Sequence, residues 1–346
     1  MAITSASLPT VEQYDVNKSI LEPLFLGQDY MQYMDVMPNV SGTIVIDRFE
    51  ALGGITKAFS SGAFTSETTE VGSTVTITPK RMEAEIAFAG NSLFNKMKGQ
   101  LMRDGHDFDN VDGSLVKNIL LDLIGQGIQS DFNRQLWLST NDATTPDATF
   151  GVYDGLFEAA FNASATEINS DYSGLTTQAD NTALVAGNGL KIMKGLYDSA
   201  SPELLEAGNH VFFVSGDIAD DYMASTLENS GFAAAGYGAL VNGVPQLTYR
   251  GIPIIVRRDW DVAIAANAAA INGVSNAAET HRAMLTTKDA FVVATDFNAN
   301  SVEQWYSNDN KEYRFRVAYS VGCALKDAKL AVIYTADAMS TTGYVA

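Results

Sequence analysis

Apolar residues recur with a helical period between residues 112 and 138. Val116, Ile119, Leu120, Leu123, Ile124 and Gly127 follow the i, i+3, i+4, i+7, i+8, i+11 spacing, with polar residues on the opposite side. Asp112 and Ser114 are suitable N-cap residues for such a helix. The pattern predicts one long amphipathic helix over residues 112–138, about 40 Å in length.

Before this helix, from residue 43, the period changes to two. Ile44 and Ile46 alternate with Val45 and Asp47, and Val75, Ile77 and the stretch from Met82 to Phe88 repeat the alternation after a Gly/Ser/Thr-rich interruption. We therefore predict a long two-stranded excursion across residues 41–90. A lone hairpin is marginally stable in water, so it should lie on another surface. An ordinary β-meander within a local core is the alternative interpretation.

Residues 1–40 mix Ser, Thr and Pro with scattered large apolar side chains. The segment is too short to fold alone, so these side chains need another surface. That surface is either the body of this chain or a neighbouring subunit.

Helices and strands alternate after the long helix. The sequence predicts an irregular stretch at 150–180, helices at 181–200 and 217–228, a buried strand at 210–216 and a Gly-rich loop at 231–243, together forming an α+β domain over 151–283. A short helix is expected at 91–103. The last third reads as strands, and the sheet that they form is the expected partner of the long helix.

The charge balance excludes some classes of protein. The 346 residues carry 41 acidic against 22 basic side chains, a net charge of −19, which disfavours a dedicated nucleic-acid-binding role. No stretch approaches eighteen apolar residues, and the first residues lack a basic segment followed by an apolar one, so we expect neither a membrane span nor a secretory signal. Cys323 is the single cysteine, and we expect a buried strand residue there.

No catalytic constellation emerges. His106, His210 and His281 are far apart and lack a metal-ligand spacing, and no nucleophile elbow or phosphate loop is present. The acidic cluster Asp104, Asp107, Asp109 and Asp112 does not match a calcium-binding loop, and helix capping explains it more simply. We therefore expect no enzyme activity, no cofactor and no metal.

Three late stretches carry a family resemblance. YRGIPIIVRRDWD (249–261), HRAMLTTKDAFVVATDF (281–297) and NKEYRFRVAYSVGCALKDAKLAVIY (310–334), in this overall organisation, resemble the major capsid proteins of tailed bacteriophages. The resemblance implies an α+β fold of the Hong Kong 97-like type. In that fold 1–40 would be an N-terminal arm, 41–90 an extended β-loop, 91–150 the spine helix and first part of the peripheral domain, 151–283 the axial domain, and 284–346 the return into the peripheral sheet and the C-terminus.

The resemblance also implies a function. The chain would be a major capsid subunit that assembles into hexamers and pentamers of an icosahedral shell around double-stranded DNA, held without sequence-specific contacts. Its partners would be copies of itself, scaffolding and portal proteins and a possible decoration protein, and it would reside in the virion after assembly in the bacterial cytoplasm. The absence of a long helical leader favours separate scaffolding or none. Candidate contacts between subunits are Leu24, Phe25, Tyr30, Tyr33, Lys57, Phe59 and Phe64.

Other classes remain open at this point. A secreted or surface-layer β-rich binding protein would carry a signal peptide and tandem repeats, and neither is found. An α+β hydrolase would need converging acid, base and nucleophile groups. Another virion structural protein, such as a tail or decoration protein, is the remaining alternative.

Overall fold

The computed structural model describes most of the chain from residue 30 onward. The described residues are 30–49, 72–89, 115–141, 149–169, 172, 174–175, 183–230, 237–241, 244–266, 280–288, 290–296, 301–307, 309–310 and 312–336. The expected helix at 91–103, the caps Asp112 and Ser114 and the acidic cluster at 104–112 lie outside this part.

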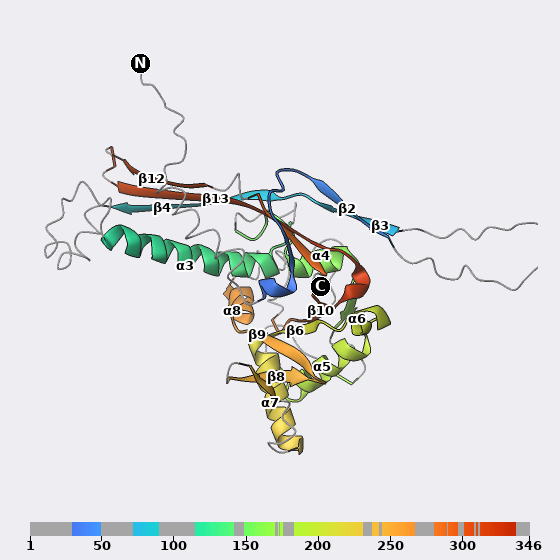
Figure 1. The fold of residues 1–346 in the computed structure, drawn as a ribbon. Coiled ribbons are helices and arrows are strands. Elements are labelled where there is room, and N and C mark those ends of the chain that lie inside the picture. Colours follow the sequence, from blue (N-terminus) through green and yellow to red (C-terminus); the bar gives the residue numbers. More distant parts are fainter. Residues whose placement is uncertain are drawn as a thin grey trace, which may run out of the picture.

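The upper part of the molecule in Figure 1 is a layer of strands with the long helix α3 (Leu115–Leu138) lying along it. The strand order is β1-β11-β13-β12, and β4 pairs with β13 as well. The strands are β1 (Asp35–Met37), β4 (Lys80–Ala89), β11 (Phe291–Ala294), β12 (Ser301–Ser307) and β13 (Glu312–Leu325). The 14 residues of β13 span about 46 Å, so this one strand runs the length of the layer.

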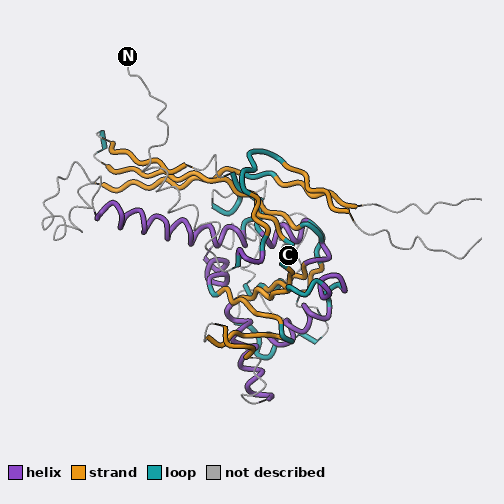
Figure 2. The backbone as a smooth tube through the Cα atoms, in the orientation of Figure 1, coloured by secondary structure: helices purple, strands orange, loops and turns teal. Residues whose placement is uncertain are grey.

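The lower part is a seven-stranded sheet with helices packed on it (Figure 2). Its order is β5-β14-β10-β6-β9-β8-β7, in which β5–β14 and β6–β9 are parallel pairs. The strands are β5 (Thr166–Ile168), β6 (His210–Ser215), β7 (Tyr237–Val241), β8 (Val244–Tyr249), β9 (Ile252–Arg257), β10 (Ala283–Thr287) and β14 (Ala331–Tyr334). The helices are α4 (Leu156–Asn162), α5 (Asn188–Asp198), α6 (Pro202–Glu206), α7 (Gly216–Ser230) and α8 (Asp259–Ala266), with short 3-10 turns at Met31–Tyr33 (η1) and Ala328–Leu330 (η3).

The end of α3 joins the two sheets through an aromatic cluster. Trp137 is fully buried, and its ring centroid lies 4.8 Å from that of Phe213 on β6 and 4.9 Å from that of Trp260 on α8. Phe157 of α4 and Tyr30 complete the cluster, and Tyr30 donates a hydrogen bond to Asn133. One continuous core therefore runs from the upper sheet through α3 into the lower sheet.

The long helix is confirmed, and Ile124 is buried as predicted, but two other positions predicted on its apolar face are exposed. Ile124, Ile128 and Phe132 face the core, and Phe132 meets Tyr319 of β13 edge to face. Leu123, predicted on the apolar face, is 58% exposed, and Gly127 is exposed too. The large side chains at the C-terminal end fix the rotation of the helix, and that constraint outweighs the average apolar direction of its N-terminal half.

The described part of the two-stranded excursion differs from the prediction in the strands that it contains. β2 (Ile44–Phe49) pairs only with β3 (Gly72–Ile77), whereas β4, expected in the same ribbon, lies against β13 from Lys80–Val321 to Ala89–Glu312. Phe88 on β4 packs against Phe315 of β13, which gives the strand a buried partner. We call β2 and β3 the ribbon (Figure 1).

Other sequence predictions have mixed outcomes. The strand at 210–216 and the helix at 217–228 are confirmed as β6 and α7, and the helix at 181–200 is the shorter α5. The prediction that residues 150–180 are irregular is wrong where α4 and β5 form. The helix α4, with the sequence LFEAAFN, has too few turns for a helical period to be recognised in the sequence. The loop at 231–243 contains β7. The strands of the last third divide between both sheets, with β10 and β14 in the lower one.

Glu158, a residue of α4, has a partly buried carboxyl group. The pKa of Glu158 is raised to about 7. Burial is the largest cause, and the negative charge of Asp154 adds to it. The buried guanidinium of Arg282 partly offsets this rise. Because the folded-state pKa lies above the unfolded one of about 4.3, the contribution of Glu158 to stability is complete at low pH and is lost as pH rises through 7.

Replacing the central indole tests whether the aromatic cluster supports both sheets. Trp137→Ala should lower the free energy of unfolding by about 3–5 kcal/mol, because it leaves a cavity in a packed core. Leu123→Ala on the exposed side of the same helix is the control and should change it by less than about 0.5 kcal/mol. Urea denaturation followed by fluorescence and circular dichroism measures both, and equal effects would contradict the described packing.

A pH-dependent measurement tests the carboxyl group. Glu158→Gln removes the ionisable carboxyl and should stabilise the protein by about 2 kcal/mol at pH 8.5, with little effect at pH 5. Thermal unfolding at the two pH values measures the difference, with Glu206→Gln on α6 as a control. A shift of the same size at both pH values would show that ionisation of Glu158 is not the cause.

Candidate functional site

The ribbon has two unlike faces. Along β2 the residues alternate, with Ile44 and Ile46 packed inward and Val45 and Phe49 outward. The outward pair is 59% and 80% exposed. An outward strand face with a fully presented Phe is unusual for a chain that works alone, because exposed apolar clusters mark contact surfaces.

Charged residues attach the ribbon to the body of the molecule. Arg48 lies on the inward side of β2, with Ile44 and Ile46. It forms an ion pair with Asp327 just before η3, and its guanidinium lies 3.9 Å from Glu203 of α6. Lys329 approaches the same Glu203 carboxylate at 3.3 Å. The inward face of the ribbon is thus attached to the body by ion pairs near Arg48, while the outward apolar face stays accessible.

Close backbone contacts also fix the ribbon. A Cβ on Gly72 would overlap the carbonyl oxygen of Arg48 on the paired strand. A Cβ on Gly322 of β13 would lie 3.1 Å from Pro79, where the chain leaves β3. Glycine at position 72 lets β3 approach β2 closely, and glycine at position 322 lets the end of the ribbon approach β13 closely.

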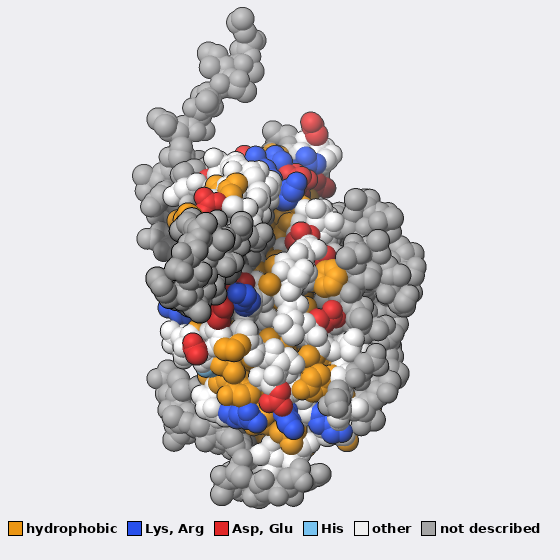
Figure 3. All heavy atoms as spheres, turned by 90° about the vertical axis from the view of Figure 1, so that its right-hand side faces the viewer, with side chains coloured by type: hydrophobic (Ala, Val, Ile, Leu, Met, Phe, Trp, Pro, Cys, Tyr) orange, Lys and Arg blue, Asp and Glu red, His pale blue; other side chains and the backbone are white. Residues whose placement is uncertain are grey.

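Further exposed apolar side chains lie away from the ribbon. Leu123 on α3, Val262 on α8 and Trp305 on β12 are 58%, 69% and 43% exposed. Figure 3 shows basic and acidic side chains interspersed on one face, so among the described residues drawn there neither sign of charge dominates. None of the described helices is long and apolar enough to cross a membrane.

The predicted contact residues divide into two groups. Tyr30 and Tyr33 lie in the described part, where Tyr30 is 1% exposed and packs on Trp137, and Tyr33 packs on Phe213. For both, the partner surface is the body of this chain, one of the two alternatives that the sequence left open. Leu24, Phe25, Lys57, Phe59 and Phe64 lie outside the described residues.

Sequence reasoning overlooked Val45 and Phe49. The signal was present, because the alternation in IVIDRF assigns Ile44 and Ile46 to one face and therefore Val45, Asp47 and Phe49 to the other. Reading only the inward positions of the strand left the outward ones unexamined.

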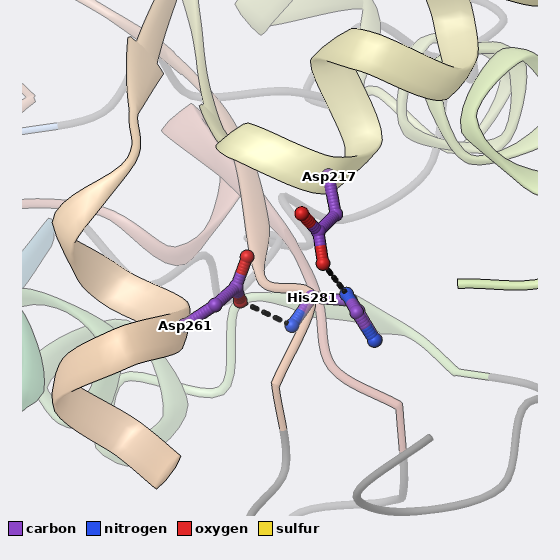
Figure 4. Close-up of side chains that lie close together, drawn as sticks. All are labelled: Asp217, Asp261 and His281. Atoms are coloured by element: carbon purple, nitrogen blue, oxygen red, sulfur yellow. Dashed lines mark hydrogen bonds and ion pairs between the residues drawn. The ribbon is translucent and has the colours of Figure 1, made fainter. Parts of the chain in front are cut away.

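One group of potential metal ligands is found among the described residues. Asp217, Asp261 and His281 bring one ligand atom each to within 4.8 Å of one another (Figure 4). Cys323 lies on β13, and burial raises the pKa of its thiol, which disfavours a nucleophilic role.

Comparison with known proteins identifies the fold. No protein-family model matches the chain, and no curated protein sequence matches it. Among solved structures, a chain of the satellite phage P4 procapsid with its size-determination protein is similar at 9% identity and a TM-score of 0.54, over 92% of this chain and 98% of that one. A chain of the native gene transfer agent (GTA) capsid is similar at 12% identity and a TM-score of 0.52, over 98% and 95%. Both likenesses run over nearly the whole of each chain, so this chain has the Hong Kong 97-like fold of bacteriophage capsid proteins.

Proposed function

We propose that this chain is the major capsid subunit of a tailed bacteriophage and has a structural rather than a catalytic role. Copies of it would assemble into hexamers and pentamers of an icosahedral shell that encloses double-stranded DNA. The observation that carries the proposal is the whole-chain similarity to capsid chains, including the long helix along a sheet and the projecting ribbon.

The exposed apolar face of the ribbon supports the proposal physically. Val45 and Phe49 are presented to solvent by a strand whose inward face is attached to the body by the ion pairs of Arg48, so a contact with another copy would require little reorganisation of the ribbon. Contacts between unlike surfaces of identical subunits close into rings or shells. Many modest contacts of this kind, repeated around a shell, stabilise it together.

The finer parts of the proposal concern division into domains and partners. Residues 1–40 would serve as the arm, 41–90 as the extended loop, 91–150 and 284–346 as the peripheral domain with the spine helix, and 151–283 as the axial domain. Leu24, Phe25, Lys57, Phe59 and Phe64 stay candidate contacts, whereas Tyr30 has little surface left for a second subunit. Scaffolding, portal and decoration proteins would be the partners, and the virion, assembled in the bacterial cytoplasm, the location.

The negative charge is compatible with enclosing DNA. A net charge of −19 gives a wall that does not bind a polyanion tightly, so packaged DNA would not adhere to it. No observation on the described residues favours a surface-layer or catalytic alternative.

The direct test is the assembly state of the purified full-length chain. Light scattering and negative-stain microscopy should detect ring-shaped oligomers or closed particles tens of nanometres across. The same measurements on the chain lacking residues 53–72 should give a folded protein with reduced assembly. A wild-type chain that stays monomeric over a wide range of salt and protein concentration, with and without candidate scaffolding proteins, would contradict the proposal.

A substitution in the ribbon tests the contact itself. The double variant Val45→Ser, Phe49→Ser should retain wild-type thermal stability, since both side chains face solvent, yet lose association energy of about 3 kcal/mol per contact, a factor of roughly 100 in the association constant. Sedimentation velocity measures the assembled fraction.

Val262→Ser is the matched control for this variant, because Val262 is equally exposed but lies on α8. Should it reduce assembly as much as the double variant, the ribbon would have no special part in the contact. A double variant that melts well below the wild type would show instead that the ribbon face is buried within the chain.

A further inference from the structure

The fold brings Asp217, Asp261 and His281 together at one edge of the seven-stranded sheet. β6 and β9 are parallel neighbours, so their carboxyl ends meet at the same edge. Asp217 follows β6 in the first turn of α7, and Asp261 follows β9 on α8. β10 runs antiparallel to β6, with Ala283 opposite Val214, so His281, two residues before β10, reaches this edge as well. Ligand sites in α/β sheets occur at such carboxyl edges.

The geometry of the three side chains is that of a convergent ligand set. The Nδ1 atom of His281 lies 3.5 Å from a carboxylate oxygen of Asp217, and the Oδ1 atom of Asp261 accepts the backbone N–H of His281 at 2.8 Å (Figure 4). In tetrahedral zinc coordination, ligand atoms stand about 3.3 Å apart. All three ligand atoms lie within 4.8 Å of one another, so small side-chain adjustments would be enough for them to share one ion.

The surroundings of the three side chains differ in a way that suits a bound cation. The imidazole of His281 is 3% exposed, whereas the Asp217 side chain is 54% exposed and leaves a path for an ion and for water ligands. Arg258 directly precedes α8. Its guanidinium donates hydrogen bonds of 2.9 Å to both carboxylate oxygens of Asp220.

The backbone holds the imidazole in place. His281 adopts a φ of 63°, the left-handed region that costs a non-glycine residue energy. The hydrogen bond from its N–H to Asp261 stabilises this conformation and so directs the side chain toward Asp217.

We propose that Asp217, Asp261 and His281 form a binding site for a first-row divalent cation, best matched by Zn²⁺. One imidazole nitrogen and two carboxylate oxygens are a ligand set that Zn²⁺ accepts, and three protein ligands leave a coordination position for water. A bound ion would tie the starts of α7 and α8 to the segment just before β10. The proposal is independent of the capsid function, because it rests on these three residues alone.

Zinc titration of the untagged full-length chain tests the site. After EDTA treatment and transfer to metal-free buffer, isothermal titration with ZnCl₂ should show one saturable ion per chain, with affinity that decreases on acidification because protons compete for the ligands. Asp217→Asn and His281→Asn should each weaken binding at least tenfold. Asparagine is chosen at 281 because it tolerates a positive φ.

Asp220→Asn removes the same charge three residues along α7 and should leave zinc affinity unchanged. Co²⁺ in place of Zn²⁺ should give the visible absorption of a low-symmetry nitrogen and oxygen site in the wild type, and Asp217→Asn should lose it. Circular dichroism checks that each variant is folded, and the exposed position of Asp217 makes that variant decisive should His281→Asn not fold. Absence of saturable binding by the wild type, or equal losses in Asp217→Asn and Asp220→Asn, would overturn the proposal.

Discussion

The burial of the C-terminal end of α3 between two β-sheets determines how the rest of the chain is arranged. Trp137 contacts Phe213 of the lower sheet and Trp260 of α8, while Phe132, one turn earlier, contacts Tyr319 of the upper sheet. Because these aromatic side chains can pack in only one rotation of the helix, they set which of its faces the upper sheet covers. The result is a single core shared by two differently built sheets.

The upper sheet extends away from this core and carries the ribbon, whose outward face is exposed. β13 pairs with β12 and β4 along one half and with β11 along the other, so the sheet extends well beyond the junction. The ribbon leaves the same sheet beside Gly322, and farther along it Arg48 attaches its inward face to Asp327. The outward face with Val45 and Phe49 is thereby held in place. Such pre-organisation lowers the entropy cost of association with another molecule.

The sequence allowed the main elements to be predicted wherever one period dominated. The 3.6-residue period of α3 and the alternation in β2 and β13 follow directly from the residues. The exposure of Leu123 could not be predicted, because the aromatic residues a few turns later control the helix rotation through contacts with distant segments. Pairing of β4 with β13, more than 200 residues later, is equally non-local. The convergence of Asp217, Asp261 and His281 depends on the order of β6, β9 and β10 in the sheet, which residue spacing does not reveal.

Electron cryomicroscopy of particles assembled from the purified chain, with scaffolding protein if assembly needs it, tests the central claim most directly. The account predicts closed icosahedral particles whose rings of five and six subunits each contain this fold, with the outward side of the ribbon, Val45 and Phe49, against a neighbouring copy. Particles without icosahedral symmetry, or a reconstruction in which both side chains face solvent in every subunit, would contradict it.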